Sequence, residues 1–126
     1  MIDRSLGLGR TMAAAIRQRG FLVHTLRSIY GEQQAQLIND TEWIRMVGDR
    51  RWLAFTKDDR VRRERLVRIA LQESGARVFC LASGNLPGHE QERRFLENLD
   101  RIIRQGRRPG PYVFGVYGKG IAKLWP

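Results

Sequence analysis

Three aspartates stand where their carboxylates could meet at one end of a folded domain: Asp3, Asp40 and Asp58. Asp3 lies at the end of whatever first strand the chain forms, and Asp58 lies two residues beyond a strand-like run that ends at Thr56. Reactive side chains in an open α/β sheet gather at the carboxyl ends of the strands. We therefore expect Asp3 and Asp58 to lie at the same edge of the sheet.

Asp40 is expected to join them by a separate argument, from helical periodicity. Residues 33–47 are predicted to form one helix, and Asp40 shares a face of it with three apolar residues: Leu37, Ile44 and Val47. An aspartate within an apolar stripe loses hydration, which is costly unless a positive group compensates for it. Glu42 lies roughly 200° around the same helix and is expected to face water. The helix face therefore favours Asp40 over Glu42.

Carboxylates gathered in this way repel one another unless a cation lies among them. Oxygen ligands with no paired His or Cys suit Mg²⁺ or Mn²⁺. Such an ion polarises a phosphodiester and lowers the pKa of a bound water for in-line attack. The alternative is that these acids are helix caps and salt-bridge partners of the many arginines. Capping competes most strongly for Asp58 and for Asp59, an accessory candidate, because both stand just before a predicted helix.

The basic residues that follow Asp58 are the candidates for contacting phosphates: Arg60, Arg62, Arg63 and Arg65. Their guanidinium groups would bind the backbone of RNA beside the metal, and the competing interpretation is a solvated helix face. The whole chain has 23 Lys and Arg against 13 Asp and Glu, a formal charge of +10, which attracts polyanions. The arginines are spread over several predicted elements, which argues against a membrane-surface helix.

Helices and strands are predicted to alternate along most of the chain. Helices are expected at residues 10–19, 33–47 and 61–73 and in a segment that ends at 104, and strands at 21–26, 52–56 and 77–81. A final hairpin is expected from residues 112–116 and 121–124. This order is typical of an α/β fold with a mostly parallel sheet and helices on both faces. Only two residues precede Asp3, so the first strand is expected to be truncated.

Length and composition exclude several classes of protein. The 126 residues, 42% of them apolar, predict a single domain spanning 1–126 rather than a disordered chain. The single cysteine, Cys80, excludes a disulfide framework and a cysteine-rich zinc site, and His24 and His89 stand alone. No apolar run approaches the roughly 20 residues of a membrane span, and the first residues are unlike a signal peptide. The sequence therefore predicts a soluble, cytoplasmic protein.

At the level of whole motifs, the chain resembles the PIN-like domain family, in the branch of VapC-type toxins. The resemblance rests on the three segments that hold the aspartates, at residues 2–7, 39–44 and 53–58, on the strand at 77–81 and on the loop at 84–86. It covers nearly the whole chain and implies a Mg²⁺-dependent endoribonuclease whose toxins are held inactive by an antitoxin. By this resemblance, Asp3, Asp40 and Asp58 would be metal-binding and catalytic. PIN domains commonly place a fourth acid after the next strand, where this chain has only Asn85, a neutral accessory candidate.

We therefore expect a metal-dependent ribonuclease that is the toxin of a type II toxin–antitoxin pair. Its partners would be RNA and a cognate antitoxin, with no membrane, and a homodimer is left open. One alternative is a PIN-like domain that binds RNA without cleaving it, which the absent fourth acid favours. Another is a phosphoacceptor domain of the receiver type, against which the charge of +10 counts.

Overall fold

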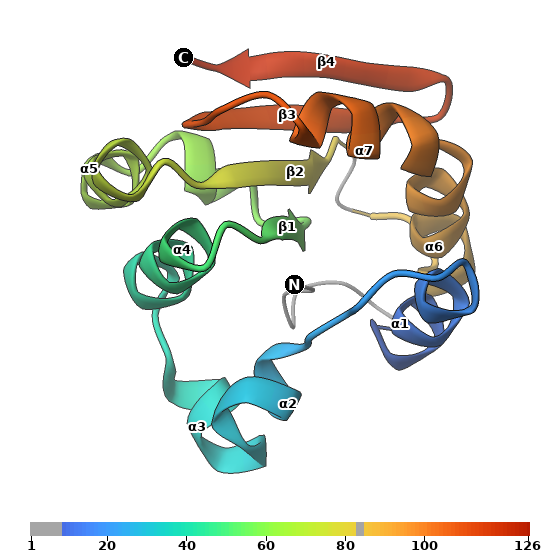
Figure 1. The fold of residues 1–126 in the computed structure, drawn as a ribbon, viewed down its shortest axis with the longest axis horizontal. Coiled ribbons are helices and arrows are strands. Elements are labelled where there is room, and N and C mark those ends of the chain that lie inside the picture. The colour runs from blue at the N-terminus through green and yellow to red at the C-terminus, as the bar shows by residue number, and fades with distance from the viewer. Residues whose placement is uncertain (1–8, 83–84) are drawn as a thin grey trace.

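A four-stranded sheet forms the centre of the computed structural model, which describes residues 9–82 and 85–126 (Figure 1). Its order is β1 (Leu53–Thr56), β2 (Arg77–Leu81), β3 (Tyr112–Tyr117) and β4 (Gly120–Trp125). The first three strands are parallel, and β4 pairs with β3 in the antiparallel direction. The predicted mostly parallel sheet with a C-terminal hairpin is confirmed, whereas Asp3 and the expected truncated strand lie outside the described residues.

Helices cover both faces of the sheet, as predicted (Figure 1). Alternate strand residues point to opposite faces, so Ala54 and Val78 join one buried cluster and Phe55 and Phe79 join the other. The first cluster lies under α4 (Asp40–Asp49) and α5 (Arg65–Ser74). The second lies under α1 (Gly9–Gln18), α6 (Gly88–Glu97) and α7 (Leu99–Gly106). Cys80 is buried in the first cluster, in keeping with a core thiol.

The prediction of a buried strand at residues 21–26 is wrong. Residues 21–24 lie in neither a helix nor a strand, and Leu22 is 94% exposed. The chain instead begins α2 (Leu26–Tyr30), which is capped by Thr25. The Thr25 Oγ1 accepts from the Ser28 amide at 3.1 Å, and the Ser28 Oγ accepts from the Thr25 amide at 2.9 Å. This reciprocal cap satisfies local backbone groups that a strand would need a neighbour to satisfy.

Three of the predicted helices are interrupted. The segment 33–47 divides into α3 (Glu32–Leu37) and α4, because the Asn39 Oδ1 accepts from the Glu42 amide at 3.0 Å and starts a new helix. The last long helix divides into α6 and α7 at Asn98, whose amide donates to the carbonyl oxygens of Arg94 and Tyr117. A short 3₁₀ helix, η1 (Asp59–Arg62), precedes α5. In each case a polar side chain bonds to the backbone within a segment for which helical periodicity alone predicts one continuous helix.

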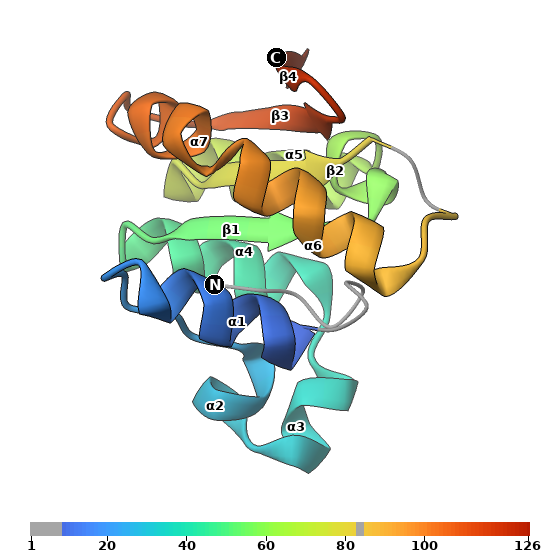
Figure 2. The same ribbon diagram turned by 90° about the vertical axis from the view of Figure 1, so that its right-hand side faces the viewer.

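The connections fix which helix ends lie at which end of the sheet. Each of α4, α5 and α7 is followed by a short link to the start of a parallel strand, so each helix runs antiparallel to that strand. In Figure 2 the parallel strands β1, β2 and β3 end on the right, which we call the carboxyl edge, and these helices end on the left, which we call the amino edge. The first residue of α4 and the segment after β1 therefore meet at the carboxyl edge.

Candidate active site

Asp58 is held at the carboxyl edge by the turn that follows β1. Its amide donates to the Oγ1 of Thr56, the buried last residue of β1, at 3.1 Å. Its Oδ1 accepts from the Arg60 amide at 3.1 Å, which makes Asp58 the N-cap of η1. The capping alternative for Asp58 thus describes a real contact. The cap uses one bond of one oxygen, so it leaves the carboxylate able to take further partners.

Asp40 reaches the same place as the first residue of α4, not from the middle of a longer helix. The expected face shared with Leu37 is wrong, because Leu37 belongs to α3 and is 78% exposed. The positive end of the helix dipole at the N-terminus of α4 stabilises the Asp40 carboxylate, whereas an apolar stripe would destabilise it. Glu42, two residues along, is exposed to water as predicted.

The indole of Trp43 fixes one oxygen of Asp40. The Trp43 Nε1 donates to the Asp40 Oδ1 at 2.8 Å, and the Trp43 side chain is completely buried. A fully buried ring therefore orients this carboxylate through its N–H group.

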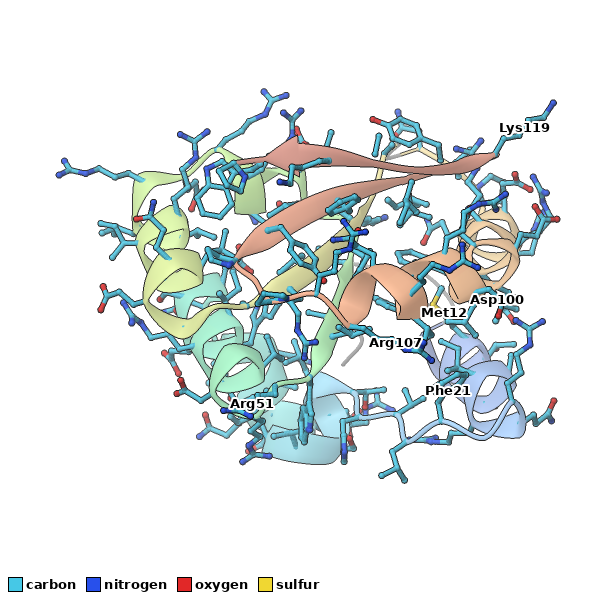
Figure 3. The ribbon with its side chains drawn as sticks, turned by 45° about the horizontal axis from the view of Figure 1, so that its top comes forward. Met12, Phe21, Arg51, Asp100, Arg107 and Lys119 are labelled. Atoms are coloured by element: carbon cyan, nitrogen blue, oxygen red, sulfur yellow. The ribbon has the colours of Figure 1, made fainter. Side chains whose placement is uncertain are left out.

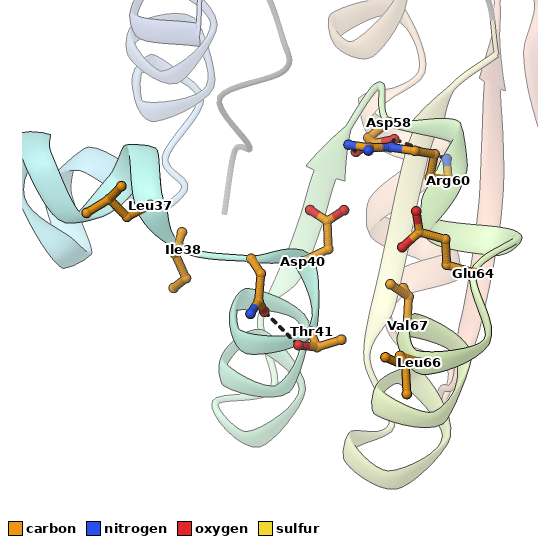
Figure 4. A pocket seen from close by; sticks show the side chains of 10 residues that line it. Leu37, Ile38, Asp40, Thr41, Asp58, Arg60, Glu64, Leu66 and Val67 are labelled. Carbon is orange, nitrogen blue, oxygen red and sulfur yellow. Dashed lines mark hydrogen bonds and ion pairs between the residues drawn. The ribbon is translucent and has the colours of Figure 1, made fainter.

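Asp40 and Asp58 line one pocket of about 790 Å³ between α4 and α5 (Figure 4). The Arg60 side chain, bonded to Asp58, holds the pKa of that carboxyl below its ordinary value, against the opposing effect of burial. An interaction with the Asp40 side chain acts in the same direction, so the two acids are neighbours. Residues that lie 18 positions apart in the sequence thus share a half-buried, oxygen-rich site.

Arg60 is itself a cation seated on this site. Its Nε and Nη2 donate to the two oxygens of Asp58 at 3.0 and 2.8 Å, and the Asp58 side chain is only 15% exposed. The pKa of Arg60 is raised by Asp58 first, and then by Asp40 and Glu64. The pocket therefore stabilises positive charge among carboxylates, which is the property that a hard divalent cation requires.

Two described carboxylates fit part of a divalent-ion site. Their donors are oxygens alone, the chemistry that Mg²⁺ and Mn²⁺ prefer. Within residues 9–82 and 85–126, no three His, Cys, Asp or Glu side chains are close enough to hold an ion together. Asp3, the third predicted ligand, lies outside those ranges, so the described part supplies Asp40 and Asp58.

The remaining predicted site residues lie around this pocket. Asp59 accepts from Arg62 at 2.7 Å and from Arg63 at 2.9 Å, an ion-pair cluster on the protein surface. Arg65 is exposed at the start of α5, and in the described part of the chain no ion pair engages it. Asn85 is exposed in the segment before α6.

The sequence analysis missed one acid of the pocket, Glu64. It precedes α5 and lines the pocket together with Asp40 and Asp58 (Figure 4). Its position in the sequence is that of an N-cap, but its side chain makes no capping hydrogen bond. Spacing gives no signal for it, because its place in the pocket depends on the turn that η1 inserts before α5.

Trp43→Phe tests whether the indole positions Asp40. The ring stays buried, but the donor to the Asp40 Oδ1 is lost, and we expect affinity for Mn²⁺ to fall about tenfold. Isothermal titration with Mn²⁺ measures this. Trp52→Phe, which alters a half-buried tryptophan stacked on His24 at the amino edge, is the matched control. Unchanged Mn²⁺ affinity in a folded Trp43→Phe variant would remove the positioning role.

Comparison with known proteins adds two matches. A family model described as "PIN like domain" matches residues 1–83, a stretch that contains all three predicted aspartates. A protein of Mycobacterium tuberculosis (strain ATCC 25618 / H37Rv) named "Putative ribonuclease VapC45" is 34% identical over 123 residues, which cover 98% of this chain and 88% of that protein. No solved structure matches the chain.

Proposed function

This chain belongs to the PIN-like domain family, and on that premise we propose that it is a metal-dependent endoribonuclease, the toxin of a type II toxin–antitoxin pair. The observation that carries the proposal is the meeting of Asp40 and Asp58 in one pocket at the carboxyl edge. The relative's name, a ribonuclease, supports RNA as the substrate. Family membership speaks against the receiver-type alternative.

Asp40 and Asp58, together with Asp3, would hold Mg²⁺ or Mn²⁺. When bound, such an ion polarises the phosphodiester and lowers the pKa of the attacking water. The chain supplies the positions: Trp43 orients Asp40 through its indole, and the cap of η1 orients Asp58. The Arg60 guanidinium, 69% exposed and beside Asp58, is placed to contact a phosphate of the RNA.

The net charge supports a polyanionic substrate and a protein partner of opposite charge. The formal charge is +10 over the whole chain, and a cognate antitoxin would have to cover part of that surface to block RNA. No helix in the part of the chain that the structure describes is long and apolar enough to cross a membrane. A toxin that acts on cellular RNA works in the cytoplasm.

Salt dependence distinguishes the arginines near Asp58. Arg62 and Arg63 already share Asp59, whereas Arg65 has no such partner among the described residues. For single-stranded RNA, we expect Arg65→Ala to reduce the magnitude of the slope of log association constant against log salt concentration by about 0.7, and Arg62→Ala to reduce it less. Fluorescence anisotropy across a salt series measures both slopes. Equal slopes in the wild type and the Arg65→Ala variant would make Arg65 a solvated surface residue.

The experiment that tests the proposed activity is cleavage of a labelled RNA by the purified protein with Mg²⁺, with Mn²⁺ and with EDTA. Cleavage that needs the ion is expected. A non-catalytic RNA-binding domain is the second candidate, and one observation favours it: Arg60 occupies both oxygens of Asp58. Such a domain would bind RNA equally well in EDTA and in Mg²⁺ and would cleave it in neither.

A further inference from the structure

Another pocket, which is basic, lies at the amino edge, opposite the candidate active site. It has a volume of about 460 Å³ and lies where α4, α5 and α7 end. Four arginines line it: Arg51, Arg77, Arg107 and Arg108. No acidic residue is among its lining residues. Figure 3 labels two of the arginines, Arg51 beyond the end of α4 and Arg107 at the end of α7.

The rest of the pocket wall is small residues and backbone. A Cβ atom added at Gly48 would lie 2.4 Å from the Ser74 Oγ, and one added at Gly110 would lie 2.3 Å from the Gly75 carbonyl oxygen. Such close approaches require glycine at these two positions. The pocket therefore presents backbone, the Pro109 ring and arginine side chains, and no large aliphatic or aromatic side chain is among its lining residues to anchor a protein segment.

Arg77 organises this edge from within. Its guanidinium donates to the backbone carbonyl oxygens of Gly106 and Arg51, at the ends of α7 and α4. Helix C-termini carry partial negative charge, and the Arg77 guanidinium offsets this charge at both helices. The side chains of Arg51, Arg107 and Arg108 are consequently not needed there.

These three arginines are exposed, and within residues 9–82 and 85–126 no ion pair engages them. In the sequence, the acid nearest to Arg51 is Asp49, and the acid nearest to Arg107 and Arg108 is Asp100. Neither acid lines the pocket, and Glu73, near the end of α5, pairs with Arg45 at 3.5 Å. The pocket thus gathers guanidinium groups that have no carboxylate partner among the described residues. A planar guanidinium group matches the geometry of a phosphate group, to which it can donate two parallel hydrogen bonds.

Arg51 also holds an unfavourable backbone conformation. Its φ is 59°, the left-handed region, where the C-terminal turn of α4 closes with the Trp52 amide donating to the Val47 carbonyl oxygen at 2.9 Å. Glycine is the usual residue at such a turn, because a Cβ atom is strained there. The side chain of Arg51 thus costs stability without an ion pair among the described residues in return, and strained positions of this kind cluster at binding and active sites.

We propose that this amino-edge pocket binds a backbone phosphate of RNA, as a second contact for the strand that enters the candidate active site. The identity of the polyanion rests on the proposed function; the pocket and its charge do not. Helix α4 spans ten residues between the two edges, or about 15 Å. At about 3.4 Å per nucleotide in a stacked strand, the two sites are roughly four to five nucleotides apart.

The test is RNA binding measured by anisotropy across a salt series, in EDTA so that no ion-dependent cleavage intervenes. The probes are a 20-nucleotide single-stranded RNA and a 4-nucleotide RNA, and the variants are Arg51→Gly and Arg107→Gln. Each variant is expected to reduce the magnitude of the slope of log association constant against log salt concentration by about 0.7 for the long RNA. Arg27→Gln, which removes an arginine paired with Glu32 at 3.3 Å, is the matched control with an unchanged slope.

Arg51→Gly separates binding from folding, because it should weaken RNA binding while raising the melting temperature by about 3 °C. Arg107→Gln keeps the test valid should Arg51→Gly fail to fold. Unchanged slopes for the long RNA, or equal losses for both RNA lengths, would overturn the proposal. Weakened binding of an acidic partner protein with intact RNA slopes would also overturn it. Failure of the wild type to cleave RNA in Mg²⁺ or Mn²⁺ would reject the proposed activity alone.

Discussion

Asp40→Asn abolishes ion-dependent RNA cleavage, while Glu42→Gln leaves it nearly unchanged: this is the largest effect we expect from a single substitution. Both acids lie in the first turn of α4, yet Asp40 lines the pocket with Asp58 whereas Glu42 faces water. Changes to groups that merely orient a metal ligand cost 10- to 100-fold in metal affinity or activity. Loss of a ligand charge should cost at least about 100-fold.

The substitution is suited to the test because it spares the fold. Asparagine keeps an oxygen that accepts from the Trp43 indole, so the 2.8 Å contact can persist. Asparagine also has an amide donor that can bond to the Asp58 carboxylate, and the variant should melt no lower than the wild type. Rates of RNA cleavage in Mg²⁺ and thermal melts without ion measure the two effects. Loss of activity in Glu42→Gln with activity retained in Asp40→Asn would reject the assignment of Asp40.

The structure brings Asp40 into one pocket with Asp58, as the sequence predicted, but the reasoning behind that prediction was only partly sound. Periodicity ran on through residues 33–47, because an apolar stripe does not reveal where a helix stops. The break depends on the Asn39 side chain, which caps α4 and makes Asp40 its first residue. The prediction that Glu42 faces water is confirmed, because the exposed side of that turn follows from local helix geometry.

Buried parallel strands were predictable where the apolar run is continuous, as at Arg77–Leu81. The same signal failed at residues 21–26, where Phe21 and Leu22 are exposed. There the informative signal was the pair Thr25 and Ser28, three residues apart, which is a cap and not a strand.

Contacts between distant segments were beyond sequence reasoning. Glu64 enters the pocket because η1 shifts the start of α5, and the amino-edge arginines converge because three helices end together. Arg60 was predicted only as a phosphate contact, but it also bonds to both oxygens of Asp58. This pair is bidentate and its carboxylate is mostly buried, so it is not an ordinary surface ion pair, and its role depends on whether an ion shares the carboxylate.

Mg²⁺ or Mn²⁺ should raise the melting temperature of the wild type, because an ion that binds only the folded protein stabilises it by linkage. At a hundredfold excess over Kd the gain is about 2.7 kcal/mol, or roughly 10 °C for a domain of this size. Asp58→Asn should remove most of this gain. Asparagine is as good an N-cap as aspartate, so the melt without ion should change little.

Asp59→Asn is the matched control for this shift. It removes the neighbouring charge, which pairs with Arg62 and Arg63, and should leave the ion-induced gain intact. Asp3→Asn extends the same measurement to the third predicted ligand and should lose the gain as Asp58→Asn does. Ca²⁺ is expected to stabilise the protein without supporting cleavage, since its coordination is looser. Should millimolar Mg²⁺, Mn²⁺ and Ca²⁺ all leave the wild-type melt unmoved, then Arg60 is the cation that the pocket is built to hold, and the protein binds RNA without cutting it.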